Sequence, residues 1–334
     1  MRRQIAGKWK KQAALLGLAA ALSFGAAACG GEEDPENSSR ELSDQEVFSI
    51  NGKSCTLAQA KIFLTNYQNL YGTAYGVNLW EHDFGDNSLE KYVKDLSISQ
   101  MAQIMSMDFL AEQEEVALTQ EENERIEEAA EAYYASLNEA ELSYMGISQG
   151  DVEEVYRQYG LANKLYQYLT SSISDEVSDD EARVMEVQRI FVTSKEAADE
   201  VMARLASGSD FMNVAATYNE SGQVEINLSR GQLPQEVEEV VFALLPEELT
   251  ECIQAEDGYY VIKCINNYNQ ELTDASKQMI LEKRRKEAFE DVYEDFIAQL
   301  PSVFNEELWE SVELVNSEEI STSNFFEIYE SYCD

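Results

Sequence analysis

Histidine, proline and basic residues are scarce in this chain. Its 334 residues include one histidine, His82, four prolines, and 24 lysines and arginines against 64 aspartates and glutamates, for a net charge of −40. The five cysteines form no CxxC pair and no other metal-type spacing, so we expect no metal site and no cofactor. The negative charge argues against binding to nucleic acid and favours neutral or cationic partners.

The N-terminus has the features of an export signal. A basic head precedes an apolar run over 13–28, whose 16 residues are too few for a typical membrane-spanning helix. The run ends in three alanines before Cys29 and resembles the lipobox of bacterial lipoproteins, in which the cysteine is acylated. We predict a lipoprotein signal peptide over 1–28, lipidation of Cys29 and a flexible polar tether over 29–45; an ordinary signal peptide with an incidental cysteine is the alternative.

The next region has the pattern of a helical domain, which we place at 46–180. A strand that begins at Val47 ends in an Asn51-Gly52 turn, and a helix follows. Apolar residues then recur every three or four positions from about Asn87 to Leu110, and again over about 149–170. Capping boxes, which are typical of helix starts, are predicted for three pairs: Thr56 with Gln59, Thr119 with Glu122, and Ser178 with Glu181.

The periodicity changes in the region that follows, which we place at 184–268. Strands are predicted over 187–192 and 224–228 and in a hairpin over 249–267, with three helices between them. The predicted order is therefore β-α-α-β-α-β-β, and a capping box from Thr193 to Glu196 is expected at the first helix.

Two features of this region and its C-terminal neighbour bear on packing. Cys252 and Cys264 flank the hairpin turn, where they form either a cross-strand disulfide or two small apolar side chains. An amphipathic helix over about 275–299 needs burial outside the α/β region, so we expect 272–334 to pack on the N-terminal domain.

Four segments in this order resemble the successive blocks of a parvulin-type (PpiC, rotamase) peptidyl-prolyl isomerase domain: "VQRIFV", "ARLASGSDFMNVAATYN", "RGQLPQEVEEVVFAL" and "GYYVIKC". The flanking "INGKSCTLAQA" and "KRRKEAFEDVYEDFIAQL" resemble the chaperone regions of PrsA-type foldase lipoproteins and of SurA. The resemblance implies an α+β fold, in which a mostly helical chaperone domain carries an inserted parvulin-like domain.

The resemblance also assigns a pocket, with departures from the family. Arg189 and Tyr260 stand where the family usually has two histidines, and Val224, with Glu225 beside it, stands where it has an aspartate or cysteine. We take Arg189, Glu225 and Tyr260 as the positions equivalent to the catalytic residues. The substrate-binding positions are Leu233, Pro234, Val237, Phe242 and Asp257.

The function that this resemblance implies is that of a lipid-anchored foldase. Its partners would be unfolded or proline-containing exported polypeptides, and its location the outer face of a Gram-positive membrane, or else a Gram-negative periplasmic leaflet. Because both histidines are replaced, we expect weak or lost isomerase activity. Two alternatives stay open: an active isomerase with a variant pocket, and a non-catalytic surface lipoprotein that binds one folded partner.

A holdase needs an apolar, adaptable surface for its clients. Methionines and tyrosines at helical spacing are candidate lining, although such stripes more often belong to a core. The candidates are Met101, Met105, Met107, Tyr67, Tyr71 and Tyr75.

Overall fold

The computed structural model describes residues 41–74, 88–315 and 319–333. His82, Tyr75, Cys29, the predicted signal peptide and most of the predicted tether lie outside these residues. The chain divides into two compact units, one formed by the N-terminal part up to Ser172 together with residues from Lys286 onward, the other by Ile173–Arg285. The fold is α+β, as predicted from the sequence.

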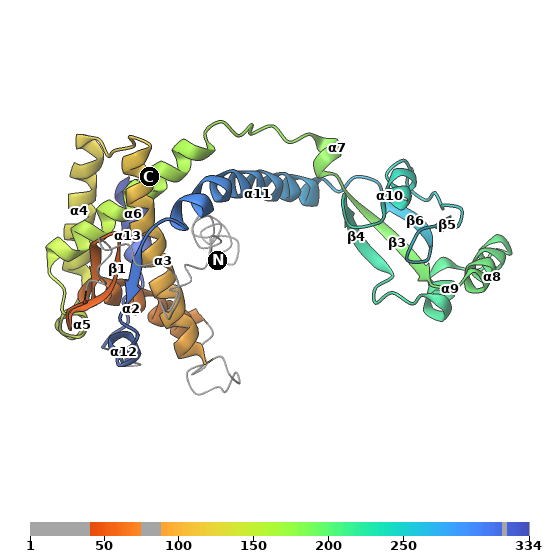
Figure 1. The fold of residues 1–334 in the computed structure, drawn as a ribbon. Coiled ribbons are helices and arrows are strands. Elements are labelled where there is room, and N and C mark those ends of the chain that lie inside the picture. Colours follow the sequence, from red (N-terminus) through yellow and green to blue (C-terminus); the bar gives the residue numbers. More distant parts are fainter. Residues whose placement is uncertain (1–40, 75–87, 316–318, 334) are drawn as a thin grey trace, which may run out of the picture. The chain divides into compact units, whose positions relative to one another are not determined.

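The first unit consists of helices around a small antiparallel sheet (Figure 1). Its strands, in the order β2-β1-β7, are β1 (Glu46–Ile50), β2 (Lys53–Thr56) and β7 (Ser302–Phe304). Its helices are α2 (Leu57–Ala74), α3 (Leu89–Gln113), α4 (Gln120–Ser136), α5 (Glu139–Met145), α6 (Gln149–Thr170), α12 (Glu306–Glu310), α13 (Phe325–Cys333) and the later part of α11 (Gln270–Ile297). None of the helices in the described ranges is both long enough and apolar enough to cross a bilayer.

Short sequence motifs mark a turn and two helix N-termini of this unit. Asn51 and Gly52 both have positive φ, 48° and 83°, as a tight hairpin turn requires, and they join β1 to a second strand that the sequence reading had missed. The predicted capping box at Thr119 and Glu122 is present at the start of α4. The predicted capping box of Thr56 and Gln59 is present at the start of α2. The backbone N–H of Thr56 donates to Oε1 of Gln59, and the backbone N–H of Gln59 donates to the Thr56 hydroxyl.

The core of this unit is apolar and rich in aromatic rings. Met101, Met105 and Met107 are fully buried in it, so these three methionines form core and do not line a groove; Tyr67, 1% exposed, belongs to the same cluster. Phe289 and Tyr293 of α11 are also fully buried in this cluster, which explains where the apolar face of that helix is covered.

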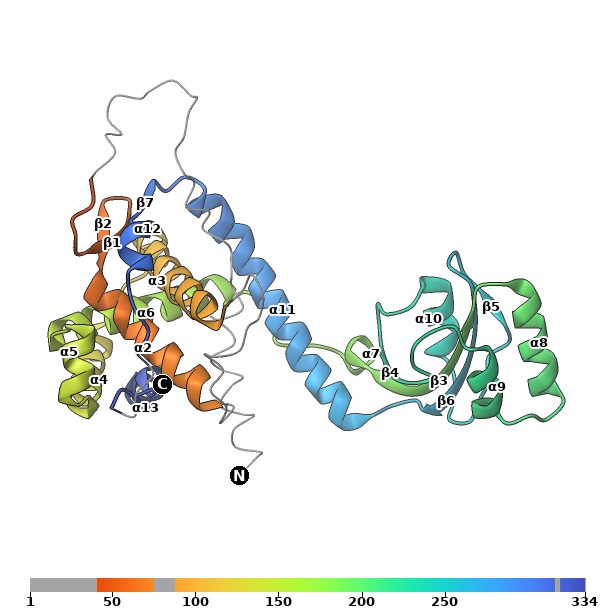
Figure 2. The same cartoon turned by 90° about the horizontal axis from the view of Figure 1, so that it is seen from below.

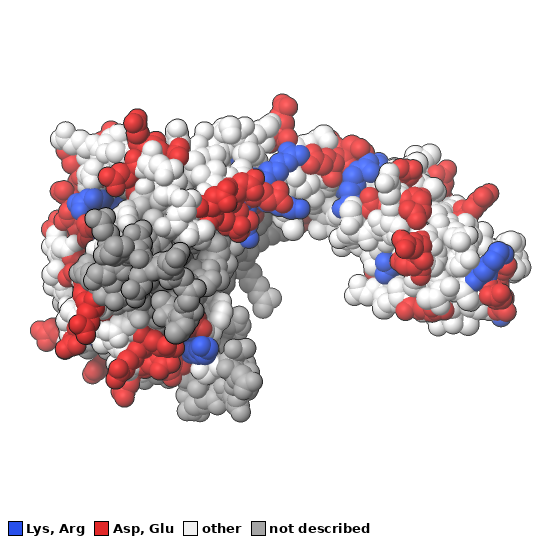
Figure 3. Space-filling model, in the orientation of Figure 1, with Lys and Arg blue, Asp and Glu red and all other residues white. Residues whose placement is uncertain are grey.

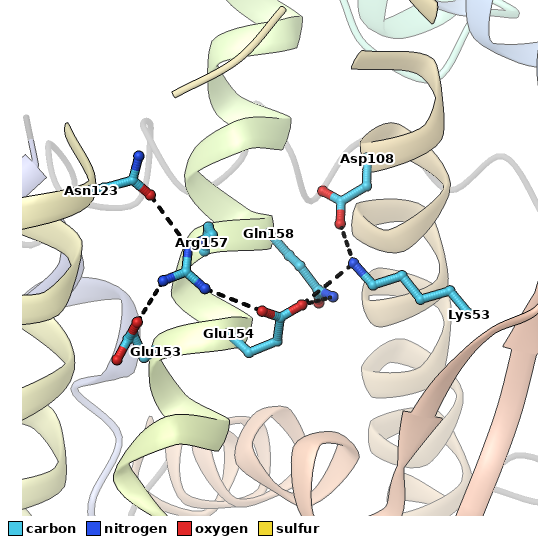
Figure 4. A network of polar contacts seen from close by, with 7 residues as sticks. All are labelled: Lys53, Asp108, Asn123, Glu153, Glu154, Arg157 and Gln158. Atoms are coloured by element: carbon cyan, nitrogen blue, oxygen red, sulfur yellow. Dashed lines mark hydrogen bonds and ion pairs between the residues drawn. The ribbon is translucent and has the colours of Figure 1, made fainter. Parts of the chain in front are cut away.

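A polar network ties the β1–β2 hairpin to α3 and α6 (Figure 4). The Nζ atom of Lys53 lies 2.8 Å from Asp108 and 3.4 Å from Glu154. Glu154 also accepts hydrogen bonds from Gln158 and Arg157 on its own helix. One lysine is therefore held by carboxylates from two helices.

The second unit is a four-stranded antiparallel sheet with helices on both faces (Figure 2). Its strands, in the order β4-β3-β6-β5, are β3 (Val184–Val192), β4 (Glu225–Ser229), β5 (Ile253–Gln254) and β6 (Tyr259–Asn266). Its helices are α7 (Asp179–Ala182), α8 (Lys195–Ala206), α9 (Phe211–Tyr218), α10 (Gln235–Val241) and the start of α11. The predicted order β-α-α-β-α-β-β is confirmed.

Two separate apolar clusters cover the two faces of this sheet. Val237 and Val241 of α10 pack on one face, whereas α8 and α9 pack on the other. Cys264 lies in the α10 cluster and Cys252 packs against the α8–α9 cluster, so the hairpin places the two thiols on opposite faces.

The predicted capping box at Thr193 and Glu196 is wrong. Ser194 is the N-cap of α8, and its hydroxyl accepts from the backbone N–H of Ala197. Thr193 is engaged elsewhere, because its N–H and its hydroxyl both donate to Glu220. Because Thr193 is hydrogen-bonded to the distant Glu220, the adjacent Ser194 caps the helix instead.

Acidic side chains are visible over the surface of both units, with fewer basic ones among them (Figure 3). Within the second unit, basic residues of α11 pair with acidic residues that precede β3. Lys277 pairs with Asp179, and Arg284 with Glu181. These ion pairs join the segment that enters the sheet to the helix that leaves it.

Candidate substrate pocket of the second unit

Two of the three catalytic-equivalent positions lie on one face of the sheet. Side chains alternate along a strand, so Arg189 and Phe191 of β3 share a face. Arg189 is paired with Ile262 of β6, and Phe191 with Tyr260. Arg189 and Tyr260 are therefore diagonal neighbours on adjacent strands, on the face that α10 covers.

Tyr260 is a core residue of this face. Its side chain is 5% exposed, and its ring centroid lies 4.9 Å from that of Phe191. Its hydroxyl donates a 2.6 Å hydrogen bond to Oδ2 of Asp257 in the preceding turn. Burial, followed by the hydrogen bond and charge of Asp257, raises the pKa of Tyr260 to about 12, against an opposing effect of Arg189. The hydroxyl is thus protonated at neutral pH, and its proton is already engaged.

The turn before Tyr260 depends on a glycine. Gly258 has φ +155°, and a Cβ atom added there would lie 2.7 Å from both the Phe191 ring and the carbonyl oxygen of Val192. The strand β6 can approach β3 so closely because this residue has no side chain.

Arg189 faces a pocket of about 510 Å³. Its backbone N–H donates to the carbonyl of Val224 at 2.8 Å, and its Nε is buried without a hydrogen-bond partner among the described residues. The other lining residues are Gln223, Glu225, Ile226, Asn227, Leu228, Gln232 and Leu233. The pocket therefore has a mixed lining, in which the apolar side chains of Ile226, Leu228 and Leu233 lie among polar ones.

The α10 wall of the pocket is largely filled by its own side chains. Pro234 is the N-cap of α10, and Val237, one turn later, is fully buried. Phe242 is 5% exposed, and guanidinium carbons of Arg183 and Arg230 lie 5.1 Å and 4.4 Å from its ring centroid. These residues hold α10 on the sheet, which leaves Leu233 as the substrate-binding candidate that lines the pocket.

Glu225 borders the same pocket as Arg189, but it does not share the face of the sheet on which Arg189 and Tyr260 lie. Its side chain is exposed and accepts a 3.0 Å hydrogen bond from Gln188, whose side chain lies on the face opposite to that of Arg189. Val224 packs against the α8–α9 cluster. Strand β4 instead presents Ile226 and Leu228 beside Arg189, which the sequence reading missed although their alternation in "VEINL" marks one face.

This arrangement suits binding of an apolar group beside a polypeptide carbonyl. Proline isomerisation requires no nucleophile and no cofactor, since its barrier of about 18–20 kcal/mol is that of twisting an amide bond. A site that binds the twisted amide more tightly than the planar forms lowers that barrier. Arg189 is a candidate donor for this purpose, because its Nε is buried without a hydrogen-bond partner among the described residues.

Comparison with known families identifies the second unit, because residues 173–277 match the model of the PPIC-type PPIASE domain. The chain carries a parvulin domain. This family match covers the sheet, α10 and the pocket described above.

Two relatives that match about two thirds of this chain have names that describe them as foldases. The "Foldase protein PrsA" of Halalkalibacterium halodurans is 24% identical over 250 residues, which cover 67% of this chain and 70% of the relative. The protein of the same name from Caldanaerobacter subterraneus is 21% identical over 241 residues, covering 66% and 74%. Both relatives extend well beyond the parvulin domain into the helical unit.

Solved structures with partial similarity include the peptidylprolyl isomerase PrsA from Bacillus cereus. It is 17% identical, covers 75% of this chain and 96% of its own, and has a TM-score of 0.37. NmPin, the parvulin of Nitrosopumilus maritimus, is 26% identical and covers 25% of this chain and 97% of its own, with a TM-score of 0.23.

Proposed function

We propose that this chain is an extracytoplasmic foldase that binds unfolded segments of exported polypeptides, and that its parvulin domain has weak or no isomerase activity. The proposal of weak or absent isomerase activity rests on one observation: the side chains at the predicted pocket positions are already hydrogen-bonded or buried. The Tyr260 hydroxyl is engaged by Asp257, and Val237 of α10 and Phe242 at its end are buried against the sheet. A proline ring would have to displace side chains that form the core of the domain.

The foldase part of the proposal is supported by the two relatives named PrsA, which align with the helical unit as well as with the parvulin domain. High negative charge supports it as well, because it limits self-association while an unfolded chain is held. The proposed clients are neutral or cationic exported polypeptides.

Membrane attachment through Cys29 is a separate part of the proposal. The basic head, the apolar run and the small residues before Cys29 support acylation of this cysteine. Labelled fatty acid fed to the producing bacterium should be incorporated into the wild-type protein and not into Cys29→Ala. Incorporation into the variant would reject the anchor at this residue.

The foldase proposal is tested with the full chain and a chemically unfolded model protein diluted from denaturant. Suppression of aggregation, measured by light scattering, is the expected result. The proposal is rejected if scattering is unchanged at a molar excess of the chain while its far-ultraviolet circular dichroism shows that it is folded.

Activity of the parvulin domain is the second candidate function, and one observation favours it: the Nε of Arg189 has no partner in the described residues and borders the pocket. Exchange spectroscopy on a proline-containing peptide measures the rate of cis–trans exchange directly. A rate above background that falls in Arg189→Ala, and not in the matched variant Arg204→Ala on α8, would establish an active isomerase with a variant pocket. Background exchange with all three chains is what our proposal predicts.

A further inference from the structure

A segment late in the chain packs into the core of the helical unit and is held there largely through its main chain. Residues 319–333, which we call the docked segment, comprise a short irregular stretch and helix α13. Helix α13 packs against α4, and Phe325 and Phe326 belong to the core cluster of the unit. Side chains of α2, α5 and α6 form hydrogen bonds with its main chain, and Glu141 of α5 also accepts one from the Thr322 side chain.

The irregular stretch is held by one carboxylate and one amide. Oε1 of Glu141 on α5 accepts from the backbone N–H groups of Ser321 and Thr322, at 3.0 Å and 2.8 Å. Nδ2 of Asn69 on α2 donates to the carbonyl of Thr322 at 2.8 Å. Glu141 is fully buried and Asn69 is 7% exposed, so both polar groups are committed to this binding.

The start of α13 is held in the same way. The backbone N–H of Phe325 donates to Oδ1 of Asn66 at 3.1 Å, and the Tyr156 hydroxyl donates to the carbonyl of Phe325 at 2.6 Å. Asn66 is 1% exposed and Tyr156 is fully buried. Four buried side chains therefore recognise atoms that every polypeptide offers.

An aromatic cup receives the two adjacent rings of Phe325 and Phe326, and the Tyr329 ring, one turn later, packs on Tyr156 and Tyr159. Phe325 is fully buried and Phe326 is 6% exposed. The rings that contact them, with centroids between 4.4 Å and 5.9 Å away, are those of Phe63, Tyr67, Tyr133, Tyr156 and Tyr159. Such a cup selects for adjacent aromatic residues and not for one sequence.

The fit of the docked segment is close at one point and incomplete at another. A Cβ atom added at Gly160 of α6 would lie 2.8 Å from the Tyr329 hydroxyl, so α6 has a smooth surface where α13 lies on it. By contrast, the Tyr133 hydroxyl and Oδ1 of Asn324 are buried without hydrogen-bond partners among the described residues. A segment that accepted a hydrogen bond from Tyr133 and carried no unpartnered amide at the place of Asn324 would bind better than the present occupant.

We propose that this groove, formed by α2, α4, α5 and α6, is a binding site for client polypeptides, and that the docked segment is a displaceable stand-in for the client. The proposal rests on the proposed foldase function and names its site. The ligand is a segment of an exported polypeptide that carries two adjacent aromatic residues, as Phe325 and Phe326 are at the start of α13. Because α13 has nine residues, it is too short to be a stable helix on its own, so its order depends on the groove.

The test uses the full chain and a fluorescent synthetic peptide with the sequence of residues 319–333. In the wild-type chain the docked segment competes with the peptide for the groove. The apparent affinity for the peptide is therefore the intrinsic affinity multiplied by the fraction of time that the groove is empty. Phe326→Ser weakens the occupant and leaves the groove intact, so it should bind the peptide at least about tenfold more tightly. The matched control is Tyr332→Ser, also in α13, whose ring is 39% exposed; it should bind as wild type does.

A second measurement on the wild-type chain does not depend on the folding of any variant. Hydrogen exchange reports the protection of the Ser321, Thr322 and Phe325 amides. A saturating amount of the peptide should accelerate their exchange several-fold and leave core amides of α3 unchanged. A peptide with serine at both phenylalanine positions should have no effect.

Three results would overturn the proposal. These are unchanged protection of the three amides at saturating peptide, equal peptide affinity of folded Phe326→Ser and wild type, and formation of concentration-dependent dimers, which would make a second copy the occupant. If aggregation of the model protein is still suppressed in any of these cases, the foldase function stands and only this site is rejected. Loss of suppression with displaceable amides would reject the foldase function and not the peptide site.

Discussion

The Tyr260 hydroxyl and the Asp257 carboxylate form a 2.6 Å hydrogen bond across the turn that leads into β6 of the parvulin domain. This bond engages the hydroxyl of a residue that we predict, from the resemblance alone, to stand where the parvulin family usually has a histidine. Because the pKa of Tyr260 is raised to about 12, the bond persists throughout the neutral range.

Replacement of Tyr260 by phenylalanine removes this bond and keeps the ring. We expect the free energy of unfolding to fall by about 0.5–1.5 kcal/mol, since Asp257 is exposed and water replaces the lost donor. Proline isomerisation should be unchanged. Denaturant unfolding and exchange spectroscopy check both points, with Tyr259→Phe on the opposite face as the control. A selective fall in the exchange rate would show that the hydroxyl serves the substrate.

Replacement of Gly258 by alanine should destabilise the parvulin domain. The added Cβ would lie 2.7 Å from the Phe191 ring and from a backbone oxygen, at φ +155°. We expect a loss of about 2 kcal/mol or more, because backbone strain adds to the clash. Gly222→Ala is the control, since nothing lies within 4 Å of the added atom there. Thermal unfolding of the two variants should therefore differ clearly; equal midpoints would contradict the close approach of β6 to β3.

Acidification should loosen the docked segment through Glu141. Burial alone raises the pKa of this carboxyl, but hydrogen bonds from Thr322, Asn138 and Ser321 outweigh burial and lower the pKa below its ordinary value of 4.5. A carboxyl with a lowered pKa in the folded state stabilises that state above its ordinary pKa. The contribution is lost as the pH falls through the folded value.

The measurement is the difference in unfolding free energy between wild type and Glu141→Gln from pH 7 to pH 3. The difference should favour wild type at pH 7 and shrink below the ordinary pKa. Glu139→Gln, at an exposed position on the same helix, should show no such trend. A difference that does not vary with pH would mean that the charge of Glu141 does not hold the segment.

Replacement of Lys53 by methionine measures how much its ion pair with Asp108 contributes to the free energy of unfolding (Figure 4). The Asp108 side chain is 13% exposed, and its pKa is raised by burial despite the nearby lysine. Without Lys53, this carboxylate loses its ion-pair partner, and we expect a loss of about 1–3 kcal/mol in denaturant unfolding. Lys91→Met breaks an exposed pair with Asp95 and should cost less than about 1 kcal/mol. Equal losses would contradict a role for burial.

Short-range sequence patterns account for most of the secondary structure. The Asn51-Gly52 turn and the capping box of Thr119 depend on contacts within four residues, so the sequence determines them. The same logic failed at Thr193, because Glu220, distant in sequence, binds both of its polar groups. The periodic stripe that includes Met101 is compatible with a groove but more typical of a core, and the packing of the unit places Met101 in the core.

The sequence by itself determined that this chain has an α+β fold with a parvulin domain inserted in a helical unit, because strand alternation, helix periodicity and the order of the family's blocks are properties of the linear chain. Tertiary structure alone decided which side chains meet. It paired Tyr260 with Asp257, turned Glu225 away from Arg189, covered Phe242 with two arginines, and closed Glu141 on the backbone of Thr322. Such contacts depend on strand register and on packing between distant segments, and neither is encoded in any local pattern.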